Sequence, residues 1–133
     1  MTLVMVVLLL GWLLSIAFAA NRRVEENLRQ NTHLAVGSAA YAVAYIALGP
    51  YIWLSPHAFA SGEGSIAVII PLHLLAMIAI FYVLAFAARN LIMAERQSTV
   101  SFFDYSGPFF LMWFFAVGVW FVQPRVNRLV SGP

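Results

Sequence analysis

The segment 66–88, IAVIIPLHLLAMIAIFYVLAFAA, decides the fold of this chain. It runs for about 23 residues without a charged side chain, and a helix of about 20 apolar residues crosses the hydrocarbon core of a bilayer. Two more apolar runs of this kind precede it, at 2–20 and 34–54. The sequence therefore predicts transmembrane helices rather than a domain that faces water.

The composition agrees with this interpretation. Of 133 residues, 63% are hydrophobic and only 9% are charged, whereas about a quarter of an ordinary soluble domain is charged. Cysteine is absent, which excludes disulfides and thiolate metal sites. All seven basic residues are arginines beside apolar runs, a pattern typical of topology signals and lipid contact and not of nucleic-acid binding.

A fourth apolar run begins at Phe109 and is dense in aromatic residues. Up to Val122 it would be only about 21 Å long, so we expect the helix to continue past Pro124. The predicted fold is all-α: residues 1–133 form one integral membrane bundle of four transmembrane helices, at 2–20, 34–54, 66–88 and 109–128.

The arginines predict how this bundle is oriented. In a four-span chain one side carries five of them, and Arg125 and Arg128 fall on the other. The positive-inside rule then predicts a multi-pass protein of the bacterial cytoplasmic membrane with its N-terminus outside. A hairpin or surface helix in place of the last span would bring all seven arginines inside. We prefer four crossings, because aromatic-rich runs of this length usually enter the membrane.

Local signals predict further details. Ala35, Ala39 and Ala47 fall on one stripe of a helix, where small residues let helices approach closely in lipid. Pro50 should bend or end that helix. We expect Arg89 to end the third helix.

The connector that follows, 89–108, predicts the start of the last helix. Asp104 or Ser106 is expected to cap that helix, with Pro108 at its first position.

His73 is the main candidate for a binding residue, because a polar side chain inside a span costs free energy unless it is satisfied. It would serve a haem, a chlorophyll-type pigment or a quinone, with Tyr41 and Tyr45 as further candidates. The alternative is a helix–helix hydrogen bond, and bundle packing for the tyrosines. A haem held by two histidines is not indicated, since His33 and His57 lie in or next to loops.

The sequence lacks the residues that catalysis and coupled transport normally need. No acidic residue lies inside a predicted span, and coupled ion transport normally needs one. No nucleophile motif or metal-ligand spacing is present. We therefore expect no enzyme activity.

The aromatic residues of the last run indicate a contact surface. Trp113 and Trp120 are seven residues apart and should face one way on a continuous helix, with Phe109 and Phe110 beside them. These rings would face lipid, a partner helix, or a bound pigment or lipid tail. Arg22 and Arg23 are expected at the lipid headgroups.

The second half of the chain resembles small bacterial membrane proteins with four spans. The resemblance is carried by FDYSGPFFLMWFF at 103–115, then Gly118, Trp120 and QPRVN at 123–127, and by PLHL at 71–74 through Phe81 and Tyr82. It implies a bacterial four-span protein and brings no established activity, so it assigns no functional residues.

Two functions follow as expectations. The first is a small accessory or structural transmembrane subunit of a larger bacterial energy-transducing complex, respiratory or photosynthetic, whose partners are lipids and other transmembrane subunits. The second is a redox membrane protein that binds a cofactor or quinone through His73.

Overall fold

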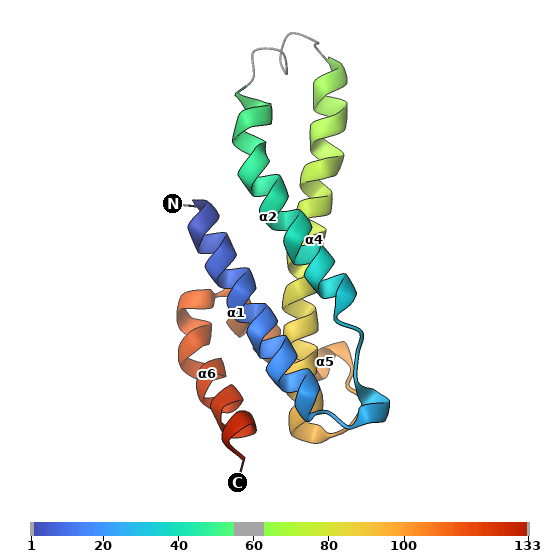
Figure 1. The fold of residues 1–133 in the computed structure, drawn as a ribbon, viewed down its shortest axis with the longest axis vertical. Helices are drawn as coiled ribbons and strands as arrows, with labels where there is room; N and C mark the ends of the chain where they lie inside the picture. The colour runs from blue at the N-terminus through green and yellow to red at the C-terminus, as the bar shows by residue number, and fades with distance from the viewer. Residues whose placement is uncertain (1, 55–62, 133) are drawn as a thin grey trace.

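The computed structural model describes residues 2–54 and 63–132, and every regular element in them is helical (Figure 1). The elements are α1 (Thr2–Arg23), a 3₁₀ turn η1 (Glu26–Leu28), α2 (His33–Trp53), α4 (Glu63–Arg96), α5 (Phe102–Trp113) and α6 (Phe115–Ser131). The all-α prediction is confirmed.

Within the described residues, three helices are long and apolar enough to cross a membrane: Thr2–Arg23, His33–Tyr51 and Ile66–Arg96. They match the first three predicted spans. The predicted end at Arg89 is wrong, because α4 continues seven residues past it, and α2 continues through Pro50 to end at Trp53, one residue before the predicted end. In both cases neighbouring helical turns hold the backbone, which a single proline or charge does not override.

The lower half of α4 is the centre of the fold. Val83, Ala87 and Leu91 are fully buried there, because α1, α5 and α6 all pack around this part of the helix. The upper half runs beside α2, beyond the first turn of α1 in Figure 1. It exposes most of its side chains.

Small residues line the face that α2 turns to its neighbours. Ala35, Ala39 and Ala42 are buried, and Val43 and Ala47 are partly buried. The predicted stripe is therefore largely confirmed. It permits the close approach of helices that stabilises bundles in lipid.

The predicted fourth span, 109–128, is not one helix. The chain breaks at Phe114, whose φ of −87° and ψ of 65° are close to an inverse γ-turn. From there α6 turns back along α5 and α1, as Figure 1 shows. A bundle of four crossing helices is thus not confirmed.

This hairpin brings the last arginines to the end of the molecule that carries the others. Arg125 forms an ion pair with Glu95 near the end of α4, and the Arg23 guanidinium donates to the carbonyl of Val130. The prediction that Arg125 and Arg128 lie opposite the other five arginines is wrong. The turn at Phe114 reverses the chain direction, so the start of α5 and the end of α6 both lie at the polar end of the molecule.

Contacts with α1 hold α6 in this position. The Trp12 indole donates to Gln123 Oε1 at 3.0 Å, and its ring meets Phe115 edge-on at a centroid distance of 5.2 Å. The Gln123 amide donates in turn to Asn127 Oδ1. Such interhelical hydrogen bonds contribute about 0.6 kcal/mol each in membrane proteins.

The start of α5 differs from the sequence prediction. Ser101 is the N-cap and Asp104 stands at the third helical position, where each bonds the other in a capping box. Neither Asp104 nor Ser106 is the cap, and Pro108 lies inside the helix. Asp104 also pairs with Arg96 at 2.6 Å, which ties the start of α5 to the end of α4.

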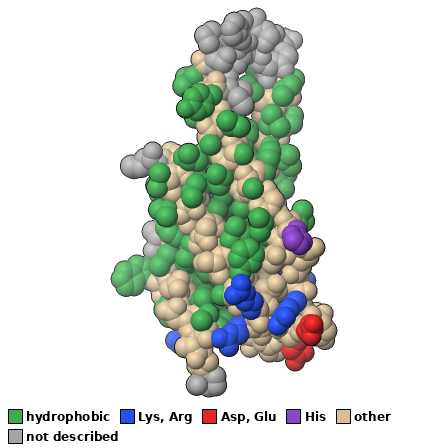
Figure 2. Space-filling view, in the orientation of Figure 1, with side chains coloured by type: hydrophobic (Ala, Val, Ile, Leu, Met, Phe, Trp, Pro, Cys, Tyr) green, Lys and Arg blue, Asp and Glu red, His purple; other side chains and the backbone are tan. Residues whose placement is uncertain are grey.

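Gln97 joins the ends of α1 and α4. It adopts a positive φ of 51° and its backbone N–H donates to the carbonyl of Met93, which ends α4. Its side chain donates to the carbonyl of Arg23 and accepts from the N–H of Glu25. Polar side chains gather at this end of the molecule, as the blue and red groups in Figure 2 show.

Candidate functional site

The structure brings the three predicted site residues together on adjacent turns of α2 and α4. The Tyr45 hydroxyl and His73 Nδ1 are 3.3 Å apart, and the imidazole tautomer sets which of them donates. Tyr41 stacks near Tyr45 at 6.3 Å between centroids and donates its hydroxyl to the carbonyl of Leu72 at 3.0 Å. We call Tyr41, Tyr45 and His73 the tyrosine–histidine cluster.

The tyrosine–histidine cluster lies in the membrane-spanning part of both helices. His73 stands about 10 Å along α4 from Ile66, at 1.5 Å per residue. The His73 side chain is nevertheless exposed, and the two tyrosines are only partly buried. Ionisable residues inside spans almost always face a bundle interior or a water-filled cavity. His73 departs from this pattern among the described residues, since its side chain is exposed.

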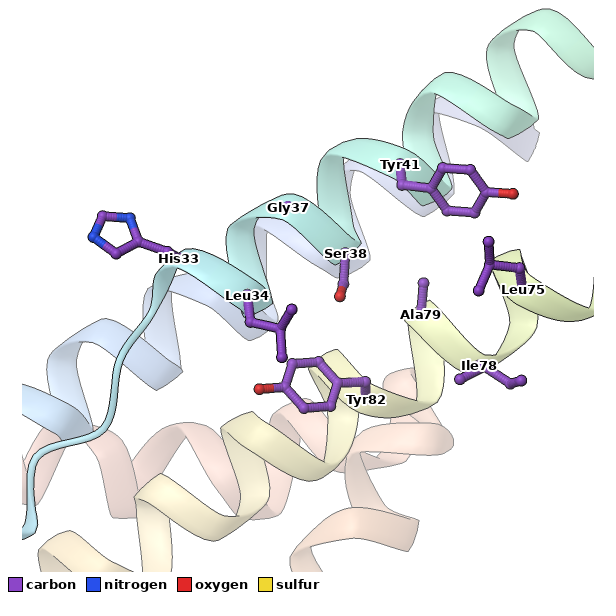
Figure 3. Close-up of a pocket in the computed structure, with 9 residues that line it drawn as sticks. All are labelled: His33, Leu34, Gly37, Ser38, Tyr41, Leu75, Ile78, Ala79 and Tyr82. Atoms are coloured by element: carbon purple, nitrogen blue, oxygen red, sulfur yellow. The ribbon is translucent and has the colours of Figure 1, made fainter. Parts of the chain in front are cut away.

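An apolar groove follows the α2–α4 seam on one side of the cluster. It has a volume of about 360 Å³ and is lined chiefly by Leu34, Leu75 and Ile78, with Tyr41 at one end and Tyr82 at the other (Figure 3). This is within the usual size range for small-molecule sites.

A second groove, of about 310 Å³, lies on the other side of the cluster. Both Tyr45 and His73 line it, together with Gly49, Pro50 and Leu54. This second groove combines apolar walls with a hydroxyl and an imidazole, so it suits a lipophilic molecule with a polar head.

The predicted cofactors fit this site unequally. The imidazole of His33, at the start of α2, points away from the first groove in Figure 3, and His57 lies outside the described residues. Within the described residues, no group of three histidine or acidic side chains is placed to hold a metal ion. A quinone needs only a hydrogen-bond donor at a carbonyl oxygen, and whichever of Tyr45 and His73 accepts in their mutual bond keeps an N–H or O–H to donate.

The predicted aromatic surface is divided by the break at Phe114. Trp113 belongs to α5 and stacks on Phe81 at 4.2 Å, and Phe109 packs beside them. Phe110 is exposed. Trp120 belongs to α6 and is 79% exposed. The two tryptophans are therefore not seven residues apart on one helix, and the prediction that they share a face is wrong.

The predicted headgroup residues lie at the polar end. The Arg22 side chain is exposed, and its carbonyl accepts from Arg29. Arg23 is exposed too, although its guanidinium bonds the end of α6.

Sequence reasoning missed the Leu72 carbonyl and the pairing of Glu95 with Arg125. Every residue has a backbone carbonyl, so nothing in the sequence marks the one at Leu72 as an acceptor. Glu95 and Arg125 are 30 residues apart, and only a hairpin at Phe114 brings them together.

No protein-family model, curated protein or solved structure matches this chain.

Proposed function

We propose that this chain is a bacterial inner-membrane protein in which α1, α2 and α4 cross the bilayer and the α5–α6 hairpin enters it from the cytoplasmic side. The arginines gather at the polar end, where they contact one another's segments, and by the positive-inside rule that end is cytoplasmic. The N-terminal end of α1 then faces outside, as expected. Trp113 stacks on Phe81, which lies about 12 Å along α4 from Arg89, so the hairpin reaches into the inner leaflet without crossing it.

Within the membrane, we propose an accessory subunit of a larger energy-transducing complex, respiratory or photosynthetic. The observation that carries this proposal is the exposed His73 beside Tyr45. Only α2 accompanies this half of α4 in Figure 1, and the His73 side chain is exposed. A transmembrane helix of another subunit would shield the exposed imidazole from lipid.

The experiment is a photo-crosslink in the native membrane. A photoreactive residue at Leu74, exposed next to His73, should form one stoichiometric adduct with another membrane subunit. The same residue at Phe121, exposed on α6, serves as the matched control and should not form that adduct. Adducts with lipid alone at both positions would contradict the proposal.

A second candidate function is a redox protein that binds a quinone. The groove lined by Tyr45 and His73 favours it, because both groups stand at the wall of an apolar space of about 310 Å³. The purified protein should then retain quinone in its lipid extract, and His73→Leu should release it. A preparation without quinone and without visible absorption would remove this candidate, and it would leave the crosslink test unaffected.

A further inference from the structure

The polar end carries unequal numbers of opposite charges. Seven arginines lie there with four carboxylates, those of Glu25, Glu26, Glu95 and Asp104. Asp104 and Glu95 are already occupied by Arg96 and Arg125. The remaining excess of positive charge attracts anions, and the anionic lipids of the cytoplasmic leaflet are the nearest source.

One pocket is lined by two of the seven arginines. It has a volume of about 440 Å³ and is lined by Glu95 of α4 and by Arg125, Arg128 and Leu129 of α6. Arg128 is exposed, and among the described residues no hydrogen bond or ion pair involves its guanidinium. It is the arginine of this pocket that is available to a ligand.

The neighbouring Arg125 side chain is held in place by Glu95. Its Nε donates to Glu95 Oε1 at 2.8 Å, and one Nη donates to Glu95 Oε2. A guanidinium has five N–H donors, so the others are left for a second acceptor. Because Glu95 fixes the fork, binding would cost little side-chain entropy.

Neighbouring residues of α6 indicate that the pocket meets the lipid phosphates. Phe121, Arg125 and Arg128 follow one another at helical spacing on a single face of α6. Trp120 and Phe121 are strongly exposed about one turn before Arg125, and an exposed tryptophan favours the headgroup level. Basic residues immediately beyond them meet the phosphate layer.

We propose that this pocket binds the phosphodiester of an anionic phospholipid. Arg128 and the spare donors of Arg125 contact the phosphate oxygens, and the acyl chains run along the face of Phe121. The Glu95 carboxylate beside the site disfavours the more highly charged inorganic phosphate, because like charges at this distance repel.

The test is native mass spectrometry of the full chain in a non-ionic detergent. Phosphatidylglycerol should remain bound where phosphatidylcholine of the same acyl chains does not. Arg128→Gln should weaken phosphatidylglycerol binding about fivefold, the effect of one basic residue at an anionic surface. Arg128→Lys, which keeps the charge but loses the fork, should weaken it less.

Arg22→Gln is the matched control, because Arg22 is equally exposed at the same end and does not line the pocket. An equal loss in both glutamine variants would mean general surface charge, and would overturn the site. Displacement of the lipid by millimolar inorganic phosphate would assign the pocket to free phosphate and overturn the lipid proposal. Unchanged binding in Arg128→Gln would overturn it as well.

Discussion

A Cβ atom built on Gly118 would stand 1.9 Å from the carbonyl oxygen of Leu111. The oxygen belongs to the backbone of α5 and has no rotamer with which to move away. Glycine is therefore the residue that lets the first turn of α6 pass the last turn of α5. This contact shapes the hairpin on which the position of the last two arginines depends.

Gly118→Ala should accordingly destabilise the protein. Overpacking of this kind costs about 1–3 kcal/mol, and thermal unfolding in detergent measures it. Gly107→Ala in α5 is the control, because nothing lies within 4 Å of the Cβ that it adds. Alanine should be neutral or slightly stabilising there. Equal unfolding midpoints for the two variants would show that the Leu111 contact does not shape the hairpin.

The hairpin also predicts the sidedness of the chain. The sequence has no cysteine, so single cysteines can report sidedness directly. Asn27→Cys and Ser131→Cys should both react with an impermeant maleimide from the cytoplasmic face, because both residues are exposed at the polar end. Thr2→Cys should react only from the opposite face. If the maleimide labelled Ser131→Cys from the same face as Thr2→Cys instead, the last segment would cross the membrane and the four-span prediction would hold.

The hydrogen bond from Tyr41 to Leu72 should contribute to the pairing of α2 with α4. Tyr41→Phe removes the hydroxyl and should cost about 0.6 kcal/mol, the average for interhelical hydrogen bonds in a membrane protein. Tyr51→Phe is the control, because that ring is 79% exposed near the end of α2. Chemical unfolding in mixed micelles would measure both variants, and a neutral Tyr41→Phe would deny the bond a role in stability.

The capping box of α5 predicts a dependence on pH. The backbone N–H and hydroxyl of Ser101, and then the Arg96 guanidinium, lower the pKa of the Asp104 carboxyl from 3.8 to about 2. Since the folded pKa lies below the unfolded one, the carboxylate stabilises the fold fully above about pH 4. That contribution is lost as the pH falls through about 2.

Unfolding midpoints measured from about pH 5, above the unfolded pKa, down to about pH 2, at the folded pKa, test this dependence. Asp104→Asn should lower the midpoint at pH 5 and flatten the fall toward pH 2. Glu26→Gln, a change at an exposed acid of the same end, should leave the fall as it is in the unchanged protein. If the unfolding midpoint of Asp104→Asn fell with pH as much as that of the unchanged protein, a group other than Asp104 would cause the fall.

Much of the fold was predictable because it depends on local properties. An apolar run as long as 66–88 has to form its own backbone hydrogen bonds in hydrocarbon, and a helix does so without help from the rest of the chain. The tyrosine–histidine cluster was visible for a related reason. A polar side chain stands out in an apolar run, and Tyr41 and Tyr45 share a helix face because they are one turn apart.

The start of α5 shows where local signals are ambiguous. Ser101, Asp104 and Ser106 are all residues that cap helices. The choice of Ser101 depends on Arg96, which pairs with Asp104 and holds it at the third helical position. That ion pair forms only when the turn between α4 and α5 brings Arg96 and Asp104 together. Residue preferences for helix caps carry no information about such a contact.

By itself the sequence determined three long membrane helices, the small-residue stripe of α2 and the clustering of most arginines, since each follows from residues close together in the chain. Only the tertiary structure decided that the last segment turns back. The break falls at Phe114, which is neither proline nor glycine, while Pro108 and Pro124 lie inside helices. The physical reason is packing across the turn. Gly118 admits the Leu111 carbonyl, and Trp12 and Glu95, distant in the chain, hold α6 where it folds back.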